Sequence, residues 1–384
     1  WTSTEEYIPH RPTLTIGRAD LTYVPSLDYR EPAFADVRNS PGFAVKIKCN
    51  GHFSKIPEEL GGHHEILTYG HSFEQLMPPA KYFQEHPEWY SLIRGKRFAK
   101  GHSDWQLCLT NSQMLAELTK NVLDAIRRNP QAYSIFVTQN DGYGQCQCDH
   151  CQAATKREGA GAGPLLEMIN AVAEQVDKEF PGFLVETFAY AWTRKTPLHV
   201  RPRSNVQIRV CGLESDFAQP IDSDANASYR DDIRGWGEIA RNVVVFHYVS
   251  GYGCFVQPHP TIFNIGPDIR FFTQNKVDGV YMDTDSTPIG DFVRLRAWVF
   301  AHMLWNPTRD SLKLAEEFAR GYYGLAGPQV LSYLQLTHNA VKRSGMKLHY
   351  ANADTSFFSL DEMNEATRLW DQAEAAVAGG RGGA

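Results

Sequence analysis

The stretch YSIFVTQNDGYGQCQCDHCQA, residues 133–153, contains a short apolar run that ends in a polar cluster. Residues 135–137 (IFV) favour a β-strand, and the sequence Gln-Asn-Asp follows at 139–141. An unbroken apolar run is typical of a strand that is buried on both faces of a parallel sheet. The stretch therefore predicts an α/β fold in which polar side chains follow the carboxyl end of a buried strand.

Similar runs recur along the chain, and helical patterns separate several of them. The strand candidates are residues 27–30, 43–48, 105–109, 134–138, 184–190, 206–211, 243–248 and 279–283. Eight strands with interleaved helices fit a (β/α)8 TIM barrel better than an open doubly wound sheet. We expect residues 23–308 to form this catalytic barrel. We expect residues 309–384 to form an appended C-terminal helical bundle that is truncated. Residues 1–22 are expected to be a linker or the tail of a missing upstream domain.

Composition excludes some classes of partner. The chain has 384 residues and a formal net charge of −6, and it contains no basic run longer than Arg127-Arg128. Such a chain lacks the positive surface that nucleic-acid binding requires. The sequence contains no apolar span of about 18 residues, so it predicts no membrane-spanning helix. We expect a periplasmic or extracellular protein whose export signal is absent from this sequence.

Polar and aromatic residues follow most of the predicted strands, or lie in the long connections between them. The candidate binding residues are Arg30, Asn50, His71, Asn140, Tyr190, Trp192, Tyr248 and Asp283, and the candidate catalytic residues are Asp141 and Glu214. Active sites of (β/α)8 barrels lie at the carboxyl ends of the strands. Sugar hydroxyls need polar partners and sugar rings need flat aromatic surfaces, so this set predicts a glycan site. Each residue also has a structural interpretation, as a turn, a solvated loop or part of the core.

The three cysteines in the opening stretch admit several interpretations. Cys146, Cys148 and Cys151 have a spacing that suits a structural zinc ion, but such a site needs four ligands. His150 or Cys211 could supply the fourth. A local disulfide and free packed thiols are alternatives, and the other cysteines are expected to be buried free thiols. No cofactor is required for the predicted activity.

Five segments resemble a known family. They are LDYREPAF (27–34), MPPAKYFQEHPEWYSLIRGK (77–96), QLCLTN (106–111), VTQNDGYGQCQCDHCQA (137–153) and LRAWVFAHMLWNP (295–307). They resemble an uncharacterised bacterial (β/α)8 barrel domain family related to the β-hexosaminidases of glycoside hydrolase family 20 and the α-glucuronidases of family 67. The resemblance covers roughly residues 23–341.

The resemblance implies a glycoside hydrolase that releases a terminal uronic acid or N-acetylhexosamine from a glycan. The family 67 pattern of an acid after the fourth strand and a base after the sixth implies Asp141 and Glu214. Arg30 matches a sugar-binding arginine, and Asn140-Asp141 aligns with the acidic pair of family 20. If Asp141 and Glu214 act together, we expect their carboxyl groups to lie roughly 6.5–9.5 Å apart, and we expect inversion at the anomeric carbon.

Two other function classes compete with hydrolysis. A non-catalytic glycan-binding barrel would keep the aromatic and polar residues without two cooperating carboxyl groups. A polysaccharide lyase would use Tyr248 with His247 as its base.

Overall fold

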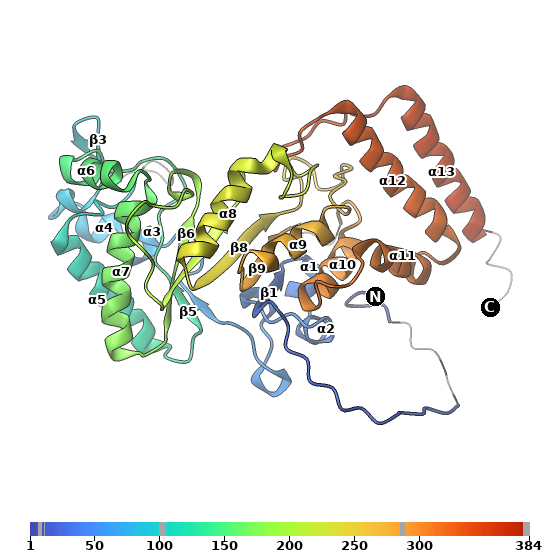
Figure 1. Ribbon diagram of the computed structural model, residues 1–384, viewed down its shortest axis with the longest axis horizontal. Coiled ribbons are helices and arrows are strands. Elements are labelled where there is room, and N and C mark those ends of the chain that lie inside the picture. Colours follow the sequence, from blue (N-terminus) through green and yellow to red (C-terminus); the bar gives the residue numbers. More distant parts are fainter. Residues whose placement is uncertain (7–9, 11, 100–104, 285–288, 379–384) are drawn as a thin grey trace.

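The structure is a computed structural model, and it describes residues 1–6, 10, 12–99, 105–284 and 289–378 (Figure 1). Seven strands form one curled parallel sheet in the order β1-β9-β8-β7-β6-β5-β2. These strands are β1 (Tyr29–Pro32), β2 (Ile66–Leu67), β5 (Ser134–Phe136), β6 (Leu184–Ala189), β7 (Val206–Cys211), β8 (Asn242–Tyr248) and β9 (Gly279–Asp283). A separate antiparallel hairpin consists of β3 (Leu92–Ile93) and β4 (Lys96–Arg97). The prediction of an α/β fold is confirmed.

Two predicted strands are wrong. Residues 43–48 belong mostly to the helix α2 (Pro41–Lys46), because Pro41 suits a first helical turn and the Ser40 side chain caps the Phe43 amide. Residues 105–109 are buried, but their only described bridge joins Leu107 to Tyr90. The sequence pattern also missed β2, which is only two residues long.

In the described part of the chain no strand pairs β1 with β2, and the chain around Asn50 lies between them. The Asn50 amide donates to the Arg30 carbonyl at 3.2 Å, and the Asn50 carbonyl accepts from the His64 amide at 2.8 Å. His64 lies two residues before the start of β2. Asn50 therefore bridges the two edges of the curled sheet through its backbone, without adopting strand conformation.

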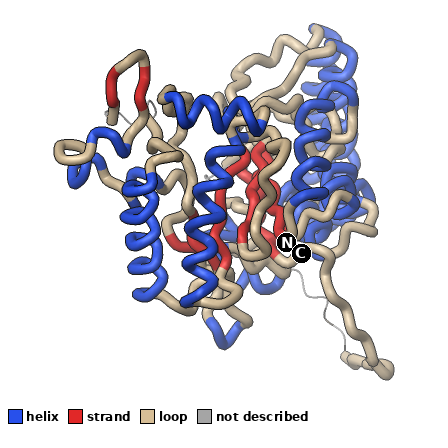
Figure 2. The backbone as a smooth tube through the Cα atoms, turned by 60° about the vertical axis from the view of Figure 1, so that its left-hand side comes forward, coloured by secondary structure: helices blue, strands red, loops and turns tan. Residues whose placement is uncertain are grey.

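Helices surround the sheet, as Figure 2 shows with helices in blue and strands in red. The α-helices are α1 (Ala35–Arg38), α2, α3 (Phe73–Leu76), α4 (Pro79–Tyr82), α5 (Ser112–Arg128), α6 (Asp149–Glu158), α7 (Ala162–Glu179), α8 (Ala227–Ile239), α9 (Ile265–Gln274), α10 (Val293–Trp305), α11 (Ser311–Tyr322), α12 (Gly327–Ser344) and α13 (Leu360–Ala378). Short 3-10 helices occur at His52–Ser54, Glu58–Leu60, Pro87–Trp89, Ala191–Thr193, Asp224–Asn226 and Gly324–Ala326. Among the described residues, no helix is long and apolar enough to span a membrane.

The C-terminal helices α11, α12 and α13 lie within residues 309–384, where the sequence predicts helices (Figure 1). Asn111 is the N-cap of α5, since its side chain accepts from the Met114 amide at 2.9 Å.

The concave face of the sheet encloses aromatic side chains. We name the cluster of Tyr29, Phe136, Phe188, Phe246 and Tyr281 the interior ring cluster. A fully buried ion pair joins Arg209 to Glu186 within it. The Arg209 guanidinium lies 5.1 Å from the Tyr29 ring centroid and 5.2 Å from that of Phe136, which stabilises its charge away from water. The described side chains thus fill the interior.

Candidate active site at the carboxyl edge of the sheet

The carboxyl ends of the parallel strands meet at one edge of the sheet. Alternate residues of a strand point to the same face. Three predicted site residues each lie two positions after a residue of the interior ring cluster. The pairs are Phe188 and Tyr190, Phe246 and Tyr248, and Tyr281 and Asp283. The fold therefore places these three at the rim above the filled interior.

Asp141 lies at this rim with two other predicted residues. Its Oδ1 atom accepts a hydrogen bond of 3.2 Å from the Tyr190 hydroxyl and lies 3.9 Å from Nε2 of His71. His71 is oriented from its other side, because Nδ1 lies 2.7 Å from the Gln139 carbonyl and must donate to it. The Asp141 side chain is 65% exposed. The structure thus brings an accessible carboxyl group, a phenol and an imidazole together.

Asp283 ends β9 and is a second carboxyl group at the rim. Burial raises its pKa from 3.8 to about 6, and hydrogen bonds from Tyr252 and Tyr281 partly offset this effect, as does the charge of Arg38. The Tyr281 hydroxyl lies 3.4 Å from Oδ1 of Asp283. A carboxyl group with this pKa is protonated in a useful fraction of molecules near pH 6 and can donate a proton. From the sequence, Asp283 was predicted only as a substrate-binding residue.

Glu31 is a buried carboxyl group that the site prediction did not include. Burial raises its pKa from 4.5 to about 7. It accepts hydrogen bonds from the Phe53 amide at 2.7 Å and from the Ser54 hydroxyl at 3.3 Å. Gly51 lies so close that an added Cβ would be 2.1 Å from Oε2 of Glu31. Residues 51–54 thus cover Glu31. Glu31 follows Tyr29 by two residues on β1, so the two side chains point to the same face of the sheet, and this spacing is the sequence signal that could have identified Glu31.

Glu214 lies in the loop after β7 and forms an ion pair. Its Oε2 lies 2.6 Å from Nη1 of Arg194, which also contacts Asp232 at 2.6 Å through Nε. The charges of both predicted catalytic residues, Asp141 and Glu214, affect Tyr190. Burial raises its pKa well above the ordinary value, and the negative charges of Asp141 and Glu214 raise it further. A direct contact between Asp141 and Glu214 is not needed for both to act on this phenol.

A cleft of about 440 Å³ lies beside the rim. Its lining includes Trp192, Arg194, Glu214, Cys146 and Cys151. The indole Nε1 of Trp192 donates to the Gly142 carbonyl at 3.1 Å, so the residue after Asp141 is linked to the wall of the cleft. Gly161 allows the close approach of the indole, because an added Cβ would lie 2.6 Å from its ring.

Arg30 and Asn50 lie elsewhere, at the amino end of β1. The Arg30 side chain is buried, stacks 5.3 Å from the Trp305 ring centroid, and donates to the backbone carbonyls of Leu27, Asp28 and Lys48. The Asn50 side chain accepts from the Arg30 amide at 2.9 Å and donates to the Asp28 carbonyl at 2.7 Å. Both side chains use their polar groups to connect segments of the protein.

Asn140 and Tyr248 are also engaged by neighbouring residues. The buried Asn140 side chain donates to the Trp105 carbonyl at 3.1 Å. The Tyr248 ring stacks on Phe217 with 3° between the ring planes and 6.3 Å between centroids. Burial raises the pKa of Tyr248 well above its ordinary value, so its hydroxyl stays protonated. Tyr248 therefore offers the rim an aromatic surface and a hydroxyl group.

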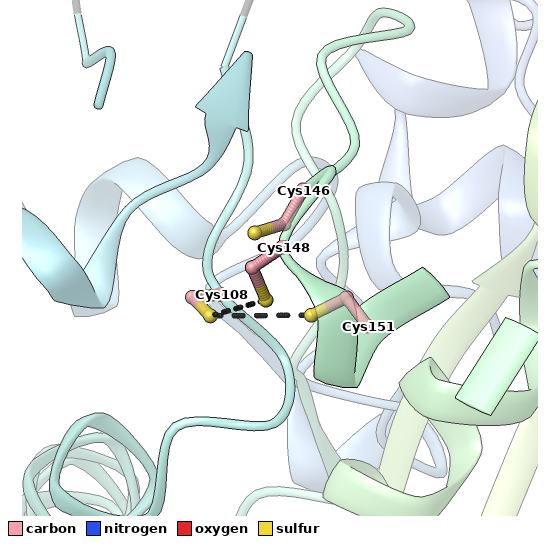
Figure 3. Close-up of side chains that lie close together, drawn as sticks. All are labelled: Cys108, Cys146, Cys148 and Cys151. Atoms are coloured by element: carbon pink, nitrogen blue, oxygen red, sulfur yellow. Dashed lines mark hydrogen bonds between the residues drawn. The ribbon is translucent and has the colours of Figure 1, made fainter. Parts of the chain in front are cut away.

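The three predicted metal-ligating cysteines meet a fourth, Cys108 (Figure 3). All four sulfur atoms lie within 4.8 Å of one another. His150 or Cys211 was the predicted fourth partner, and the structure brings Cys108 there instead. The pattern QLCLT around Cys108 gave no metal signal, because the contact depends on the fold alone.

These features define an α/β protein with ionisable and aromatic side chains at the carboxyl edge of a curled parallel sheet. The chain belongs to the family described as Domain of unknown function (DUF4838), whose sequence profile matches residues 1–335. This match agrees with the resemblance to an uncharacterised domain family.

Two further comparisons add little. No curated protein matches the sequence. The solved structure of a GH138 enzyme targeting pectin rhamnogalacturonan II matches with a TM-score of 0.32 and 10% identity, over 93% of this chain and 52% of that chain. The chain thus spans about half the length of that protein. A likeness at this TM-score supports no conclusion about function.

Proposed function

We propose that the protein is a glycoside hydrolase that uses two carboxyl groups at the carboxyl edge of the sheet. The observation that supports this most is the pair of unlike carboxyl environments at one rim. Asp283 is buried with a pKa of about 6, whereas Asp141 is exposed and accepts a hydrogen bond from Tyr190. Glycoside hydrolysis requires one protonated and one ionised carboxyl group.

In the proposed reaction Asp283 is the general acid and Asp141 the general base. Asp283 transfers its proton to the glycosidic oxygen, and the bond from that oxygen to the anomeric carbon breaks. Asp141 takes a proton from the water that attacks the same carbon. Strands β6, β7 and β8 lie between β5 and β9 in the sheet, so the two carboxyl groups follow strands that are not neighbours. We therefore propose inversion at the anomeric carbon, with Asp141 and Glu214 as the alternative carboxyl pair.

We also propose that the sheet and the bridging residue Asn50 together form the eight positions of a (β/α)8 barrel. The two backbone hydrogen bonds of Asn50, to Arg30 and from His64, support this interpretation. In such a barrel the fourth and eighth positions, which precede Asp141 and Asp283, face each other across the rim.

A terminal uronic acid is the substrate that the rim favours over N-acetylhexosamine. Cationic or ionisable groups lie near both carboxyl groups: His71 lies beside Asp141, and the charge of Arg38 partly offsets the effect of burial on the pKa of Asp283. A sugar carboxylate would pair with such groups. The acetamide group of N-acetylhexosamine would need the Asn140 side chain, which is buried and already donates to a backbone carbonyl.

Aryl uronides and aryl N-acetylhexosaminides test this proposal directly. We expect hydrolysis of an aryl uronide, no hydrolysis of the N-acetylhexosaminide, and a lower rate of hydrolysis in Asp283→Asn. NMR spectroscopy of the first product anomer would report inversion. An unsaturated sugar product would indicate a lyase instead. The lyase alternative has less support, because His247 is buried and lies 3.3 Å from Asp268.

Non-catalytic glycan binding is the second candidate function. The cleft beside the rim supports it, since Trp192, Arg194 and Glu214 line the cleft and Asp141 is not among its lining residues. An aromatic ring with polar neighbours suits a sugar whether or not a bond is cleaved. Oligosaccharide binding that Trp192→Ala abolishes, with no turnover of any tested glycan, would favour this function over hydrolysis.

A further inference from the structure

We propose that Cys108, Cys146, Cys148 and Cys151 bind one structural zinc ion in the wall of the cleft. The Sγ atom of Cys108 lies 3.7 Å from that of Cys148 and 3.9 Å from that of Cys151. Zinc binds four thiolates in a tetrahedron at a distance of about 2.3 Å, which requires sulfur separations of roughly 3.8 Å. These two separations match this geometry.

The four thiols lie close together, as Figure 3 shows. Cys148 precedes the first residue of α6, and Cys151 lies in its first turn. Cys108 comes from the buried segment before α5, 40 residues before Cys148 in the chain. A disulfide would use two of these thiols and leave the other two without a function, whereas a single ion uses all four.

The surroundings of the sulfur atoms suit thiolates. The Leu92 amide lies 3.3 Å from Sγ of Cys146, and Nη1 of Arg97 lies 3.7 Å from the same atom. The Thr110 hydroxyl lies 3.2 Å from Sγ of Cys151. Donors of this kind orient metal-bound thiolates, and the arginine offsets the negative charge of a zinc ion with four thiolates. The amino end of α6 adds a further favourable electrostatic contribution.

The position of the cluster gives the ion a structural role. Three of the cysteines follow Asp141 within ten residues, and Cys146 and Cys151 line the cleft with Trp192. Gln106, two residues before Cys108, donates to the Asn140 carbonyl at 2.9 Å. The zinc ion would therefore hold the two chain segments that together position Asn140 and Asp141. It has no open coordination position for a substrate.

Metal analysis of the purified full chain tests the proposal. We expect one zinc ion per chain, and we expect Co²⁺ added to the metal-free protein to give the intense visible bands of tetrahedral thiolate coordination. Cys108→Ser should lower zinc affinity at least about tenfold, because it removes one of four ligands. Cys49→Ser is the control, since Cys49 is a buried free thiol outside the cluster and should keep the zinc content unchanged.

Cys148→Ser provides a second variant in case Cys108→Ser does not fold, because Cys148 is only half-buried. This variant should also lose zinc and should unfold at a lower temperature than the zinc-loaded wild type. Three results would overturn the proposal. They are a disulfide between any two of the four cysteines in the non-reduced protein, iron rather than zinc in the purified chain, and wild-type protein that binds neither Zn²⁺ nor Co²⁺.

Discussion

The Tyr190 hydroxyl donates a hydrogen bond of 3.2 Å to Oδ1 of Asp141, and this bond joins the chain after β6 to the chain after β5. Burial raises the pKa of Tyr190, so the phenol remains a donor across the pH range in which enzymes work. His71 lies 3.9 Å from the same oxygen. This arrangement orients an accessible carboxylate without burying it, as a base that activates water requires.

Asp141→Asn should lower turnover about a hundredfold or more, since general acid–base catalysis contributes on that order. Steady-state kinetics on an aryl uronide measure the effect. Tyr190→Phe is the control, because it keeps the ring and removes only the hydroxyl that orients Asp141, and it should lower turnover less. Full activity of a folded Asp141→Asn variant would exclude Asp141 from the reaction.

Asp283 should determine the alkaline side of the pH profile. Its pKa of about 6 means that the proposed acid loses its proton as pH rises through this value. We expect kcat/KM to fall above about pH 6 in the wild type. In Asp283→Asn the remaining activity should lack this limb, and substrates with better leaving groups should partly restore the rate. A wild-type profile that stays flat well above this pKa would contradict the assignment.

Glu214→Gln distinguishes the two carboxyl pairs. If Asp141 and Asp283 act together, removal of the Glu214 charge should raise KM or lower stability slightly and leave kcat within about tenfold of the wild type. Its ion pair with Arg194 involves a half-exposed carboxylate, so the effect on folding should be small. A loss of kcat as large as that of Asp141→Asn would instead support the pair of Asp141 and Glu214.

Glu31 should make the folded state less stable as pH rises. Its pKa is about 7 in the folded protein and 4.5 in the unfolded chain, so the folded state binds the extra proton between these values. The free energy of unfolding should fall by on the order of 3 kcal/mol as pH rises through this window. Urea unfolding at a series of pH values should show a smaller slope for Glu31→Gln. An identical slope in both proteins would contradict the prediction.

Gly51→Ala should destabilise the fold by roughly 1–3 kcal/mol, because residues around a filled site must move to accept a methyl group. The added Cβ would lie 2.5 Å from Cβ of Glu31. Because that atom is bonded directly to the backbone of β1, rotation of the Glu31 side chain cannot relieve the contact. Gly42→Ala is the matched control, since an added Cβ at Gly42 has no neighbour within 4 Å. Thermal unfolding of both variants should separate them, and equal stability would contradict the steric argument.

The sequence by itself predicted an α/β protein, most of the strands of its sheet and the helices at its C-terminal end. Apolar runs and caps such as Asn111 are local signals, and local signals suffice for elements longer than a few residues. Local patterns failed at β2 and at residues 43–48, where a two-residue strand and a proline-initiated helix have no distinctive period. Asp141, His71 and Tyr190 were also among the candidate site residues that the sequence predicted.

Only the tertiary structure decided which of these residues meet. Asp141, His71 and Tyr190 are distant in sequence, and they come together because parallel strands end at one edge of the sheet. Cys108 joins three cysteines that lie far from it in the sequence for the same kind of reason, and Arg30 bonds backbone carbonyls at the other end of β1. Burial, which raises the pKa of Asp283 and Glu31, is a property of packing in three dimensions that no short stretch of sequence contains.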